Sequence, residues 1–195
     1  MKNFLIKKEL INDIDITIKV LKKLRLQSNK VFIELCSKSI EAIEKNKKIL
    51  FFGNGGSAAD SQHLATEITV RFKKNRKALP AISLATDTSA LTAIGNDFNF
   101  NKIFSRQIDA IGNKGDIAIG ITTSGNSKNI IEAAKMCKKK DIKFFAFSGN
   151  SGGLLKKYCR DMIIIPSKET SIIQTIEILI GQTFCKVIEK KLGQK

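Results

Sequence analysis

The sequence predicts an α/β fold: a doubly wound, five-stranded parallel sheet, close to flavodoxin topology, with two helices before it. Three observations lead to this fold class. Five short, nearly all-apolar segments are typical of parallel strands that are buried on both faces. Helical stretches alternate with these segments. The chain has 195 residues, which favours one such domain with an added helical segment.

Two helices are expected before the first strand. Apolar residues recur at helical spacing from residue 6 to residue 26, and again from Asn29 to Lys45. The sheet is complete without them, and so residues 1–47 are predicted to form a helical arm or a dimerisation element. Residues 48–195 are predicted to form the α/β domain.

The remaining elements follow in alternation. Strands are expected at residues 49–52, 81–84, 116–121, 143–147 and 162–165. Helices are expected at residues 57–73, 89–110 with a break near Gly95, 127–139, 151–158 and 171–190. No apolar run is read as long enough to span a bilayer, and the charged N-terminus lacks the apolar core of an export signal.

The composition indicates a cytoplasmic protein with a basic surface. Its cysteines lie in apolar segments without metal-type spacing, which is typical of buried, reduced thiols: Cys36, Cys137, Cys159 and Cys185. The formal net charge is +16, but the lysines are scattered and lack the interleaved aromatic residues of an RNA-binding sheet. A nucleic-acid partner is therefore disfavoured, whereas such a surface would attract a phosphorylated small molecule.

Two loops of the same chemistry follow strands of the expected sheet. They read GNGGS at residues 53–57 and TTSGNS at residues 122–127. Glycines let the backbone approach a ligand, and helix N-terminal amides and hydroxyls donate to an anion. Small residues also make ligand-free turns and caps, but two such loops at one sheet edge favour a ligand. Neither loop has a Walker or GxGxxG pattern, which favours the terminal phosphate of a small molecule.

The only histidine lies on the helix that the first loop opens. His63 precedes Glu67 by four residues, so the two side chains share one helix face. Such a pair is typical of half a divalent metal site or of an acid–base pair, although an exposed pair without function has the same spacing. Glu67 is read as the only carboxylate on the His63 face.

Three segments in order and spacing resemble the bacterial phosphoheptose (sedoheptulose 7-phosphate) isomerases of the sugar isomerase (SIS) domain superfamily: GNGGSAADSQHLATE, ATDTSALTAIGNDFNFNKIFSRQIDAIG and GDIAIGITTSGNSKNI. The resemblance covers the chain from Lys48 on. It implies an SIS fold and a homotetramer with active sites at subunit interfaces. It also implies conversion of sedoheptulose 7-phosphate to D-glycero-D-manno-heptose 7-phosphate. That reaction is the first step toward nucleotide-activated heptose for lipopolysaccharide, capsule or S-layer glycans.

The resemblance further implies roles for single residues. Glu67 matches the catalytic base, and His63, Glu67 and Gln174 match zinc ligands. Hydroxyls in both loops match phosphate contacts. The full set implied to contact substrate is Asn54, Gly55, Gly56, Ser57, Asn96, Asp97, Thr122, Thr123, Ser124, Ser127 and Gln174.

The last helix departs from the family pattern. Eight residues after Gln174, where the family has a histidine that binds zinc and acts as the second acid–base group, this chain has Gln182. Glutamine cannot shuttle a proton near neutral pH and is a poor zinc ligand beside imidazole. By its position, Gln182 is assigned to both the catalytic residues and the metal ligands, and the sequence does not decide whether zinc is bound. Because eight helical residues rise about 12 Å, Gln174 and Gln182 would serve one site only from neighbouring subunits.

A function of a different class is also open. The chain could be a non-catalytic SIS-fold protein that binds a sugar phosphate or a replication-initiator partner. The net charge of +16, Thr175 and Gln182 favour this alternative. The intact loops and the Gly95-Asn96-Asp97 motif favour the isomerase.

Overall fold

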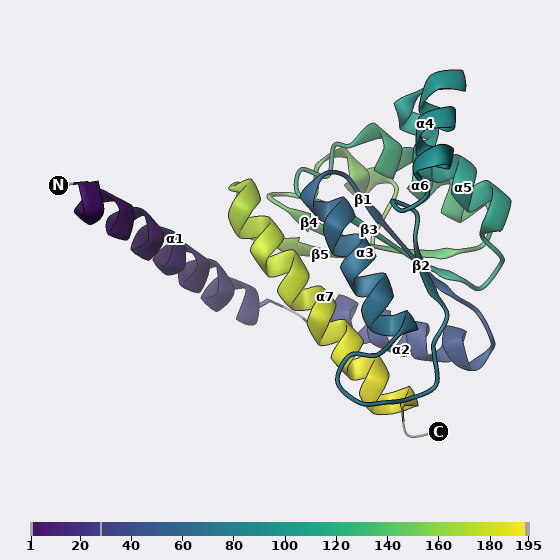
Figure 1. The fold of residues 1–195 in the computed structure, drawn as a ribbon, viewed down its shortest axis with the longest axis horizontal. Helices are drawn as coiled ribbons and strands as arrows, with labels where there is room; N and C mark the ends of the chain where they lie inside the picture. The colour runs from purple at the N-terminus through teal and green to yellow at the C-terminus, as the bar shows by residue number, and fades with distance from the viewer. Residues whose placement is uncertain (1, 28, 194–195) are drawn as a thin grey trace.

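The computed structural model describes residues 2–27 and 29–193. Its five strands are β1 (Ile49–Gly53), β2 (Ala81–Ser83), β3 (Ile117–Thr122), β4 (Lys143–Gly149) and β5 (Met162–Ile165). They form one parallel sheet in the order β2-β1-β3-β4-β5 (Figure 1). This is the flavodoxin-like order, and it confirms the predicted fold class.

The strands separate two hydrophobic cores. In β1, Ile49 and Phe51 join one core, and Leu50 and Phe52 join the other, because successive side chains of a strand point to opposite faces. The ring of Phe52 lies 5.3 Å from that of Phe104, between centroids, within the second core. Burial on both faces explains why the strands appear in the sequence as continuous apolar runs.

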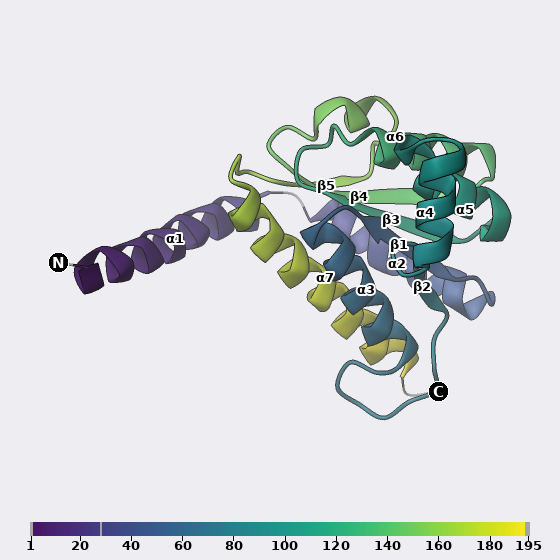
Figure 2. The ribbon, with the colours of Figure 1, turned by 45° about the horizontal axis from the view of Figure 1, so that its top comes forward.

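Helices cover both faces of the sheet (Figures 1 and 2). On one face pack α2 (Lys30–Glu44), α3 (Gly56–Thr69) and α7 (Thr170–Leu192). On the other face pack α5 (Ile103–Ile111) and α6 (Lys128–Lys139), and α4 (Thr88–Asp97) projects at the rim. Three of these helices, α3, α6 and α7, begin just beyond the carboxyl ends of β1, β3 and β5, so their N-termini share one edge of the sheet.

The two N-terminal helices differ in their packing. Helix α1 (Lys2–Arg25) packs on α7 through its C-terminal part, where Val20 is buried, and its N-terminal part extends away from the rest of the chain (Figures 1 and 2). Its exposed apolar side chains are Leu5, Ile6, Leu10, Ile11, Ile14 and Ile18. Helix α2 instead buries Leu35, Cys36 and Ile43 in the core beneath the sheet. Only α1 therefore projects, and the role of residues 1–47 as one arm stays a prediction.

Two predicted helices take a different form. The break expected near Gly95 falls later, after Phe98, where a short 3-10 helix η1 (Phe100–Lys102) separates α4 from α5. The Asn99 side chain accepts a hydrogen bond from the Asn101 N–H and so starts η1 instead of continuing α4. The helix expected at residues 151–158 is a 3-10 helix, η2 (Gly153–Lys157). Gly152 and Gly153 have φ values of +81° and +52°, which an α-helix cannot accommodate.

Helix α7 corrects the expectation that no apolar segment is long enough for a membrane. Among the described residues it is the one helix with the length and composition to cross a bilayer. Its apolar side chains, such as Ile176, Phe184 and Ile188, are buried between the sheet and the neighbouring helices α2 and α3. The position of α7 in the core accounts for its composition.

The cysteines are buried and unpaired, as the sequence predicts. Burial raises the pKa of the Cys36 thiol to about 11 and that of Cys137 to about 12. Such thiols stay protonated near neutral pH and are therefore unreactive.

Candidate active site

The loop between β1 and α3 begins the candidate site. Gly55 has a φ of +56°, a conformation that L side chains rarely adopt. A Cβ on Gly56 would lie 2.5 Å from Nε2 of Gln174, so the Gln174 side chain of α7 packs directly on the start of α3. Ser57 is buried in the first turn of α3. The unbonded N–H groups of this turn give the loop a partial positive charge.

The second loop lies directly beside the first. Asn54 and Asn129 exchange two side-chain hydrogen bonds, of 3.0 and 2.8 Å, and so join the loops that follow β1 and β3. The hydroxyl oxygens of Thr122 and Ser127 lie 3.4 Å apart, and the Gly125 N–H donates to Thr122 over 3.3 Å. The structure therefore brings together the two hydroxyl-rich loops that the sequence singles out.

A third loop, after β4, supports the second. The Gly149 N–H donates to the Thr123 carbonyl over 3.0 Å. A Cβ on Gly125 would lie 2.2 Å from the Gly152 carbonyl oxygen, so the two loops touch through their backbones. The Ser124 hydroxyl accepts from the Asn126 N–H over 3.1 Å and is exposed. Its proton remains available to a ligand.

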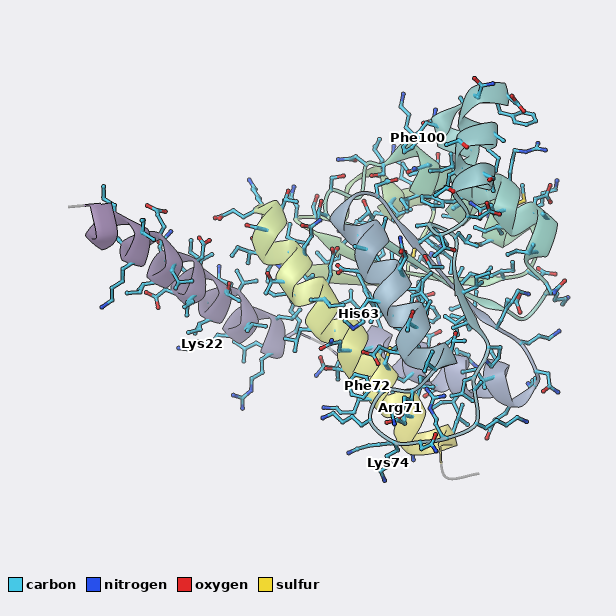
Figure 3. The ribbon with its side chains drawn as sticks, in the orientation of Figure 1. Lys22, His63, Arg71, Phe72, Lys74 and Phe100 are labelled. Carbon is cyan, nitrogen blue, oxygen red and sulfur yellow. The ribbon has the colours of Figure 1, made fainter. Side chains whose placement is uncertain are left out.

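His63 and Glu67 share one face of α3, as predicted, with His63 Nε2 3.0 Å from Glu67 Oε1. The amide nitrogen of Gln182 on α7 lies 3.5 Å from the same ring nitrogen. Gly181 permits this approach, because a Cβ there would lie 2.4 Å from Cδ1 of Leu64. His63 thus projects at the junction of α3 and α7 (Figure 3). We call His63, Glu67 and Gln182 the His63 cluster.

The chemistry of this cluster leaves the Gln182 amide available. His63 Nε2 either donates a proton to Glu67 or accepts one from Gln182, but it cannot do both. The 3.0 Å contact with the Glu67 carboxylate is the shorter and charge-assisted one. The Gln182 amide is then free to donate to a bound molecule.

Gln174 belongs to the other end of the α3–α7 contact. Its side chain packs on Gly56 at the start of α3, whereas Gln182 contacts His63 farther along the same helix. Within one protomer the structure brings Gln182 to His63 but leaves Gln174 at the loop. This agrees with the helix rise of about 12 Å between the two glutamines.

Asn96 and Asp97 lie apart from the loops. They end α4, a helix without buried residues that projects at the rim of the molecule (Figure 1). The Asn96 amide donates to the Asp97 carboxylate over 2.9 Å, and both side chains are exposed. Among the described residues α4 packs mainly on α5 and η1, on the other face of the sheet from α3, so this motif does not join the His63 cluster of its own protomer.

Comparisons with known proteins place the chain in a family. The SIS domain profile matches residues 14–149. The chain is 50% identical over 150 residues to a phosphoheptose isomerase of Campylobacter jejuni, which covers 77% of this chain and 81% of that relative. It is also 50% identical over 157 residues to the phosphoheptose isomerase of Clostridium acetobutylicum, with 80% of each chain covered. The chain belongs to the phosphoheptose isomerase family of SIS domain proteins.

Solved structures of the family share the whole fold. Phosphoheptose isomerase GmhA from Neisseria gonorrhoeae superposes with a TM-score of 0.88 and 35% identity, over 95% of this chain and 99% of that one. A phosphoheptose isomerase from Francisella tularensis gives a TM-score of 0.89 at 31% identity, over 96% and 98% of the two chains. The family fold therefore includes the N-terminal helices as well as the sheet.

The zinc set that the resemblance implies is incomplete in this member of the family. In the described part of the chain, no three His, Cys, Asp or Glu side chains gather to hold a metal ion. The His63 cluster offers one imidazole, one carboxylate and one amide, and an amide is a poor ligand for zinc. These residues do not fit a zinc centre within one protomer.

Two acidic residues beside the site were missed by sequence reasoning. Asp60 lies three residues before His63 on α3, so the reading of Glu67 as the only carboxylate on that face was wrong. Burial raises the pKa of Asp60, and His63 partly opposes this. Glu177 on α7 is 1% exposed, and neither of its oxygens forms a hydrogen bond of ordinary geometry among the described residues, although the Ser57 hydroxyl lies near. In the sequence, Glu177 stands within the mostly apolar run IIQTIEILI, and this position could have indicated that its carboxyl is buried.

Glu177 is held as a neutral acid near pH 7. Burial and, to a smaller extent, the charge of Asp60 raise its pKa from 4.5 to about 8, and the Ser57 hydroxyl opposes part of this shift. The folded state thus keeps a proton that the unfolded chain releases above pH 4.5. This contribution to stability is complete below that pH and is lost as the pH rises toward about 8.

We expect Glu177→Gln to flatten this pH dependence, because glutamine keeps the shape but carries no ionisable proton. A tenfold change in proton affinity corresponds to about 1.4 kcal/mol, so the variant should regain a few kcal/mol of unfolding free energy at pH 8 relative to pH 5. Urea denaturation at the two pH values measures this. Glu9→Gln on the exposed face of α1 is the matched control. An unchanged difference between the two pH values in Glu177→Gln would contradict the assignment.

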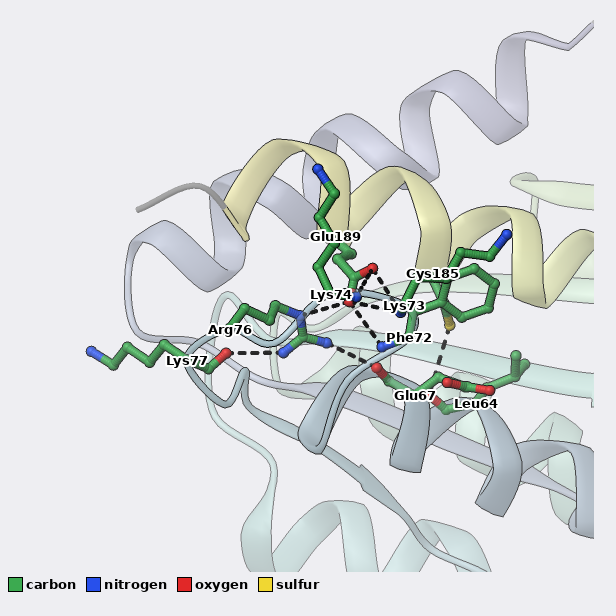
Figure 4. Close-up of polar contacts among 9 residues, drawn as sticks. All are labelled: Leu64, Glu67, Phe72, Lys73, Lys74, Arg76, Lys77, Cys185 and Glu189. Carbon is green, nitrogen blue, oxygen red and sulfur yellow. Dashed lines mark hydrogen bonds and ion pairs between the residues drawn. The ribbon is translucent and has the colours of Figure 1, made fainter.

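A buried ion pair fixes the end of α3 that carries Glu67 (Figure 4). The Glu189 carboxylate of α7 accepts hydrogen bonds from the N–H groups of Phe72, Lys73 and Lys74 at 2.8 to 3.2 Å. The Arg76 guanidinium lies 3.4 Å from the same carboxylate and donates to the Glu67 carbonyl over 2.8 Å. These bonds also explain why α3 ends at Thr69 rather than at the predicted residue 73. We call this arrangement the Glu189 clasp.

The two charged side chains that form the ion pair of the clasp are buried. The side chains of Arg76 and Glu189 are 1% and 5% exposed. Burial alone would raise the pKa of Glu189, but the three N–H groups and Arg76 hold it below its usual value. Glu189 and the N–H groups that it binds lie more than 100 residues apart in sequence, so no local sequence pattern predicts their contact.

Proposed function

We propose that the protein converts sedoheptulose 7-phosphate to D-glycero-D-manno-heptose 7-phosphate, as an aldose–ketose isomerase. The observation that carries this proposal is the position of Glu67. Glu67 lies beside His63 and Gln182 on α3. Helix α3 begins at the first glycine-rich loop, and hydrogen bonds between Asn54 and Asn129 join that loop to the second, hydroxyl-rich loop. The reaction requires a base near a sugar whose phosphate is anchored, and this arrangement supplies both.

The phosphate anchor is built from backbone and hydroxyl donors. Helices α3 and α6 begin at the two loops, so their N-terminal N–H groups and partial positive charges are available to an anion. Ser57, Thr122, Ser124 and Ser127 supply hydroxyls around them. A terminal phosphate bound here would direct the sugar chain along α3 toward the His63 cluster.

Glu67 is the base of the proposed reaction. Its carboxylate removes a proton from C1 of the ketose, a C1–C2 double bond forms, and the C2 oxygen takes the negative charge of an enediolate. The proton of the C1 hydroxyl passes through water to the C2 oxygen, and Glu67 returns its proton to C2 as the C1 carbonyl forms. Atoms and charge balance without a further reactant. His63 holds the carboxylate in place by its 3.0 Å contact.

Gln182 stabilises the oxygens in place of a second acid–base group. Its amide can donate to the C1 or C2 oxygen, where negative charge develops as the C1 proton leaves. It cannot donate a proton fully, so the proton that moves from the C1 oxygen to the C2 oxygen passes through water.

Zinc would be bound only weakly by this donor set. The metal would polarise the sugar carbonyl in a complete site, and His63 and Glu67 are the strong ligands present. We expect turnover of the native protein to withstand a chelator.

Gln182→His should create a zinc site, because the new imidazole would join His63 and Glu67 at the 3.5 Å contact. Metal analysis after dialysis against zinc and then buffer should give about one zinc per chain in the variant and much less in the native protein. The control is Gln62→His, an exposed position on α3. Equal zinc content in Gln182→His and the control would contradict the geometry of the cluster.

We further propose a homotetramer with active sites shared between subunits. The exposed apolar residues of α1 supply an unpartnered surface in the protomer. Asn96 and Asp97, which do not reach the His63 cluster of their own protomer, would then serve a neighbour's site. Light scattering should give four chains per particle, and a monomer at micromolar concentration would contradict this.

Mixing two inactive variants tests the shared site directly. If Glu67 and Asp97 of one site come from different chains, refolding Glu67→Gln together with Asp97→Asn should regain part of the native turnover. With random assembly about one site in four would be intact. Refolding each variant alone is the control. No regained activity, with tetramers formed, would place both residues in one protomer.

The expected cellular role follows from the product. Heptose 7-phosphate made by this reaction would supply nucleotide-activated heptose for surface glycans such as lipopolysaccharide or capsule. We place the protein in the cytoplasm, which accords with four buried cysteines that form no disulfide.

The decisive experiment is proton exchange. We expect sedoheptulose 7-phosphate incubated with the protein in deuterated water to gain deuterium at C1, followed by magnetic resonance, with the aldose appearing at the same time. Absence of both would overturn the isomerase assignment and favour a non-catalytic sugar-phosphate protein.

A further inference from the structure

A second pocket lies at the opposite end of the sheet from the candidate active site. It is a groove of about 610 Å³ between α6 and the segment that joins η2 to β5. Lys143 opens β4 in this groove, while Gly149 closes β4 beside Thr123. Six residue steps of strand separate them, or about 20 Å. The groove therefore cannot belong to the same ligand as the loops.

The lining of the groove is strongly cationic. It includes five basic side chains and one acidic side chain: Lys135, Lys138, Lys143, Lys157, Arg160 and Asp161. Lys135 is paired with Glu132, and Lys143 is paired with Asp161 and Glu34.

The other three basic side chains lining the groove, Lys138, Lys157 and Arg160, make no ion pair within residues 2–27 and 29–193. Their three charges exceed the partial charge of about −0.5 at the C-terminus of α6. A net positive field therefore remains to attract an anion.

The groove also has an aromatic wall and an apolar floor. The ring of Tyr158 is 46% exposed, and the ammonium of Lys135 lies 5.0 Å from its centroid. Ala134, Phe144 and Cys159 are buried beneath it. An exposed aromatic face over apolar side chains is suited to stacking with a planar ring, and neighbouring cations are suited to phosphate groups.

We propose that this groove binds a small molecule that carries both a planar ring and a chain of phosphate groups, as a nucleoside triphosphate does. Tyr158 stacks on the ring, and Lys138, Lys157 and Arg160 contact the phosphates. The volume suits such a ligand, since small-molecule pockets measure about 300–1,000 Å³. A single exposed aromatic side chain does not provide the row of stacking platforms that a nucleic-acid strand requires.

The composition of the chain allows ligand binding in the groove to be followed by tyrosine fluorescence. Tyr158 is its only tyrosine, and it has no tryptophan, so tyrosine emission reports this groove alone. Inorganic tripolyphosphate does not absorb at the excitation wavelength and serves as the first probe. We expect its addition to change the emission along a saturating curve below about 1 mM. ATP, measured by calorimetry, should bind at least about tenfold more tightly than tripolyphosphate, because the ring adds stacking.

Variants separate the two halves of the site. The double variant Lys157→Ala, Arg160→Ala should weaken both probes at least about tenfold, and Tyr158→Leu should weaken ATP alone in calorimetry. Lys19→Ala, Lys22→Ala on α1 removes the same charge elsewhere and should leave binding unchanged. Ser124→Ala, at the proposed substrate phosphate, should also leave ATP binding unchanged. The double variant in the groove should retain native turnover of sedoheptulose 7-phosphate.

Four results would overturn the proposal. The first is no saturable emission change up to about 5 mM tripolyphosphate. The second is equal weakening by the α1 double variant, which would indicate only the overall charge. The third is ATP binding no tighter than tripolyphosphate. The fourth is displacement of ATP by an equimolar single-stranded RNA oligonucleotide, which would assign the surface to nucleic acid. None of these results depends on whether the isomerase assignment holds.

Discussion

Glu67→Gln is expected to lower the turnover of sedoheptulose 7-phosphate at least about 100-fold, the usual contribution of a positioned base. Glutamine keeps the shape of the side chain and the contact with His63, but it cannot accept the C1 proton. Substrate affinity should change little, because the proposed phosphate contacts lie in the loops rather than at Glu67. Calorimetry with the substrate and a coupled assay of kcat separate the two quantities.

The control for this variant is Glu41→Gln, which lies on the exposed face of α2 away from the site. Deuterium incorporation at C1 should fall in parallel with kcat, because both depend on the same proton removal. If exchange persisted at the native rate while kcat fell, Glu67 would act in a later step, and another carboxylate, such as Asp60, would be the base.

Glu189→Ala is expected to destabilise the protein by about 3–5 kcal/mol, the cost of breaking one partner of a buried ion pair. Arg76 would remain buried without its counter-charge, and the N–H groups of Phe72, Lys73 and Lys74 would lose their acceptor. The end of α3 would also loosen, because Arg76 bonds to the Glu67 carbonyl. Urea denaturation at pH 7 measures the loss of stability.

Glu189→Gln serves as the conservative comparison and should lose less, since the amide oxygen can still accept from the backbone. A loss below about 1 kcal/mol in Glu189→Ala, typical of an exposed pair, would show that the clasp contributes little. The native protein should also weaken on acidification. Because the pKa of Glu189 lies below its usual value, its contribution is complete above about pH 4.5 and is lost as the pH falls through the lowered value.

The sequence predicted those features that local spacing determines. Continuous apolar runs identified the strands of a doubly buried sheet, as Leu50 and Phe52 illustrate on one face and Ile49 and Phe51 on the other. The i, i+4 spacing placed His63 and Glu67 on one face of α3. The two glycine-rich loops that the sequence singles out lie side by side, and their role as an anion site stays a prediction.

Features that depend on contacts between distant segments were not predicted. The approach of Gln182 to His63 depends on Gly181 packing against Leu64, and no periodicity encodes which helices become neighbours. Sequence periodicity likewise does not indicate that the Glu177 carboxyl is buried, or at which residue α3 ends. The cationic groove around Tyr158 also assembles residues from α6, β4 and the segment before β5.

Because α3, α6 and α7 begin at a common edge of the sheet, the rate at which an anionic substrate arrives and the time for which it stays bound depend on different groups. Surface lysines, which make up much of the +16 charge, accelerate the arrival of an anion by long-range steering, and salt weakens that steering. The backbone amides of the helix starts act only at contact, and no acetylation or change of pH removes them. Chemical modification of the lysines would therefore slow association while leaving the residence time of the bound sugar phosphate nearly unchanged.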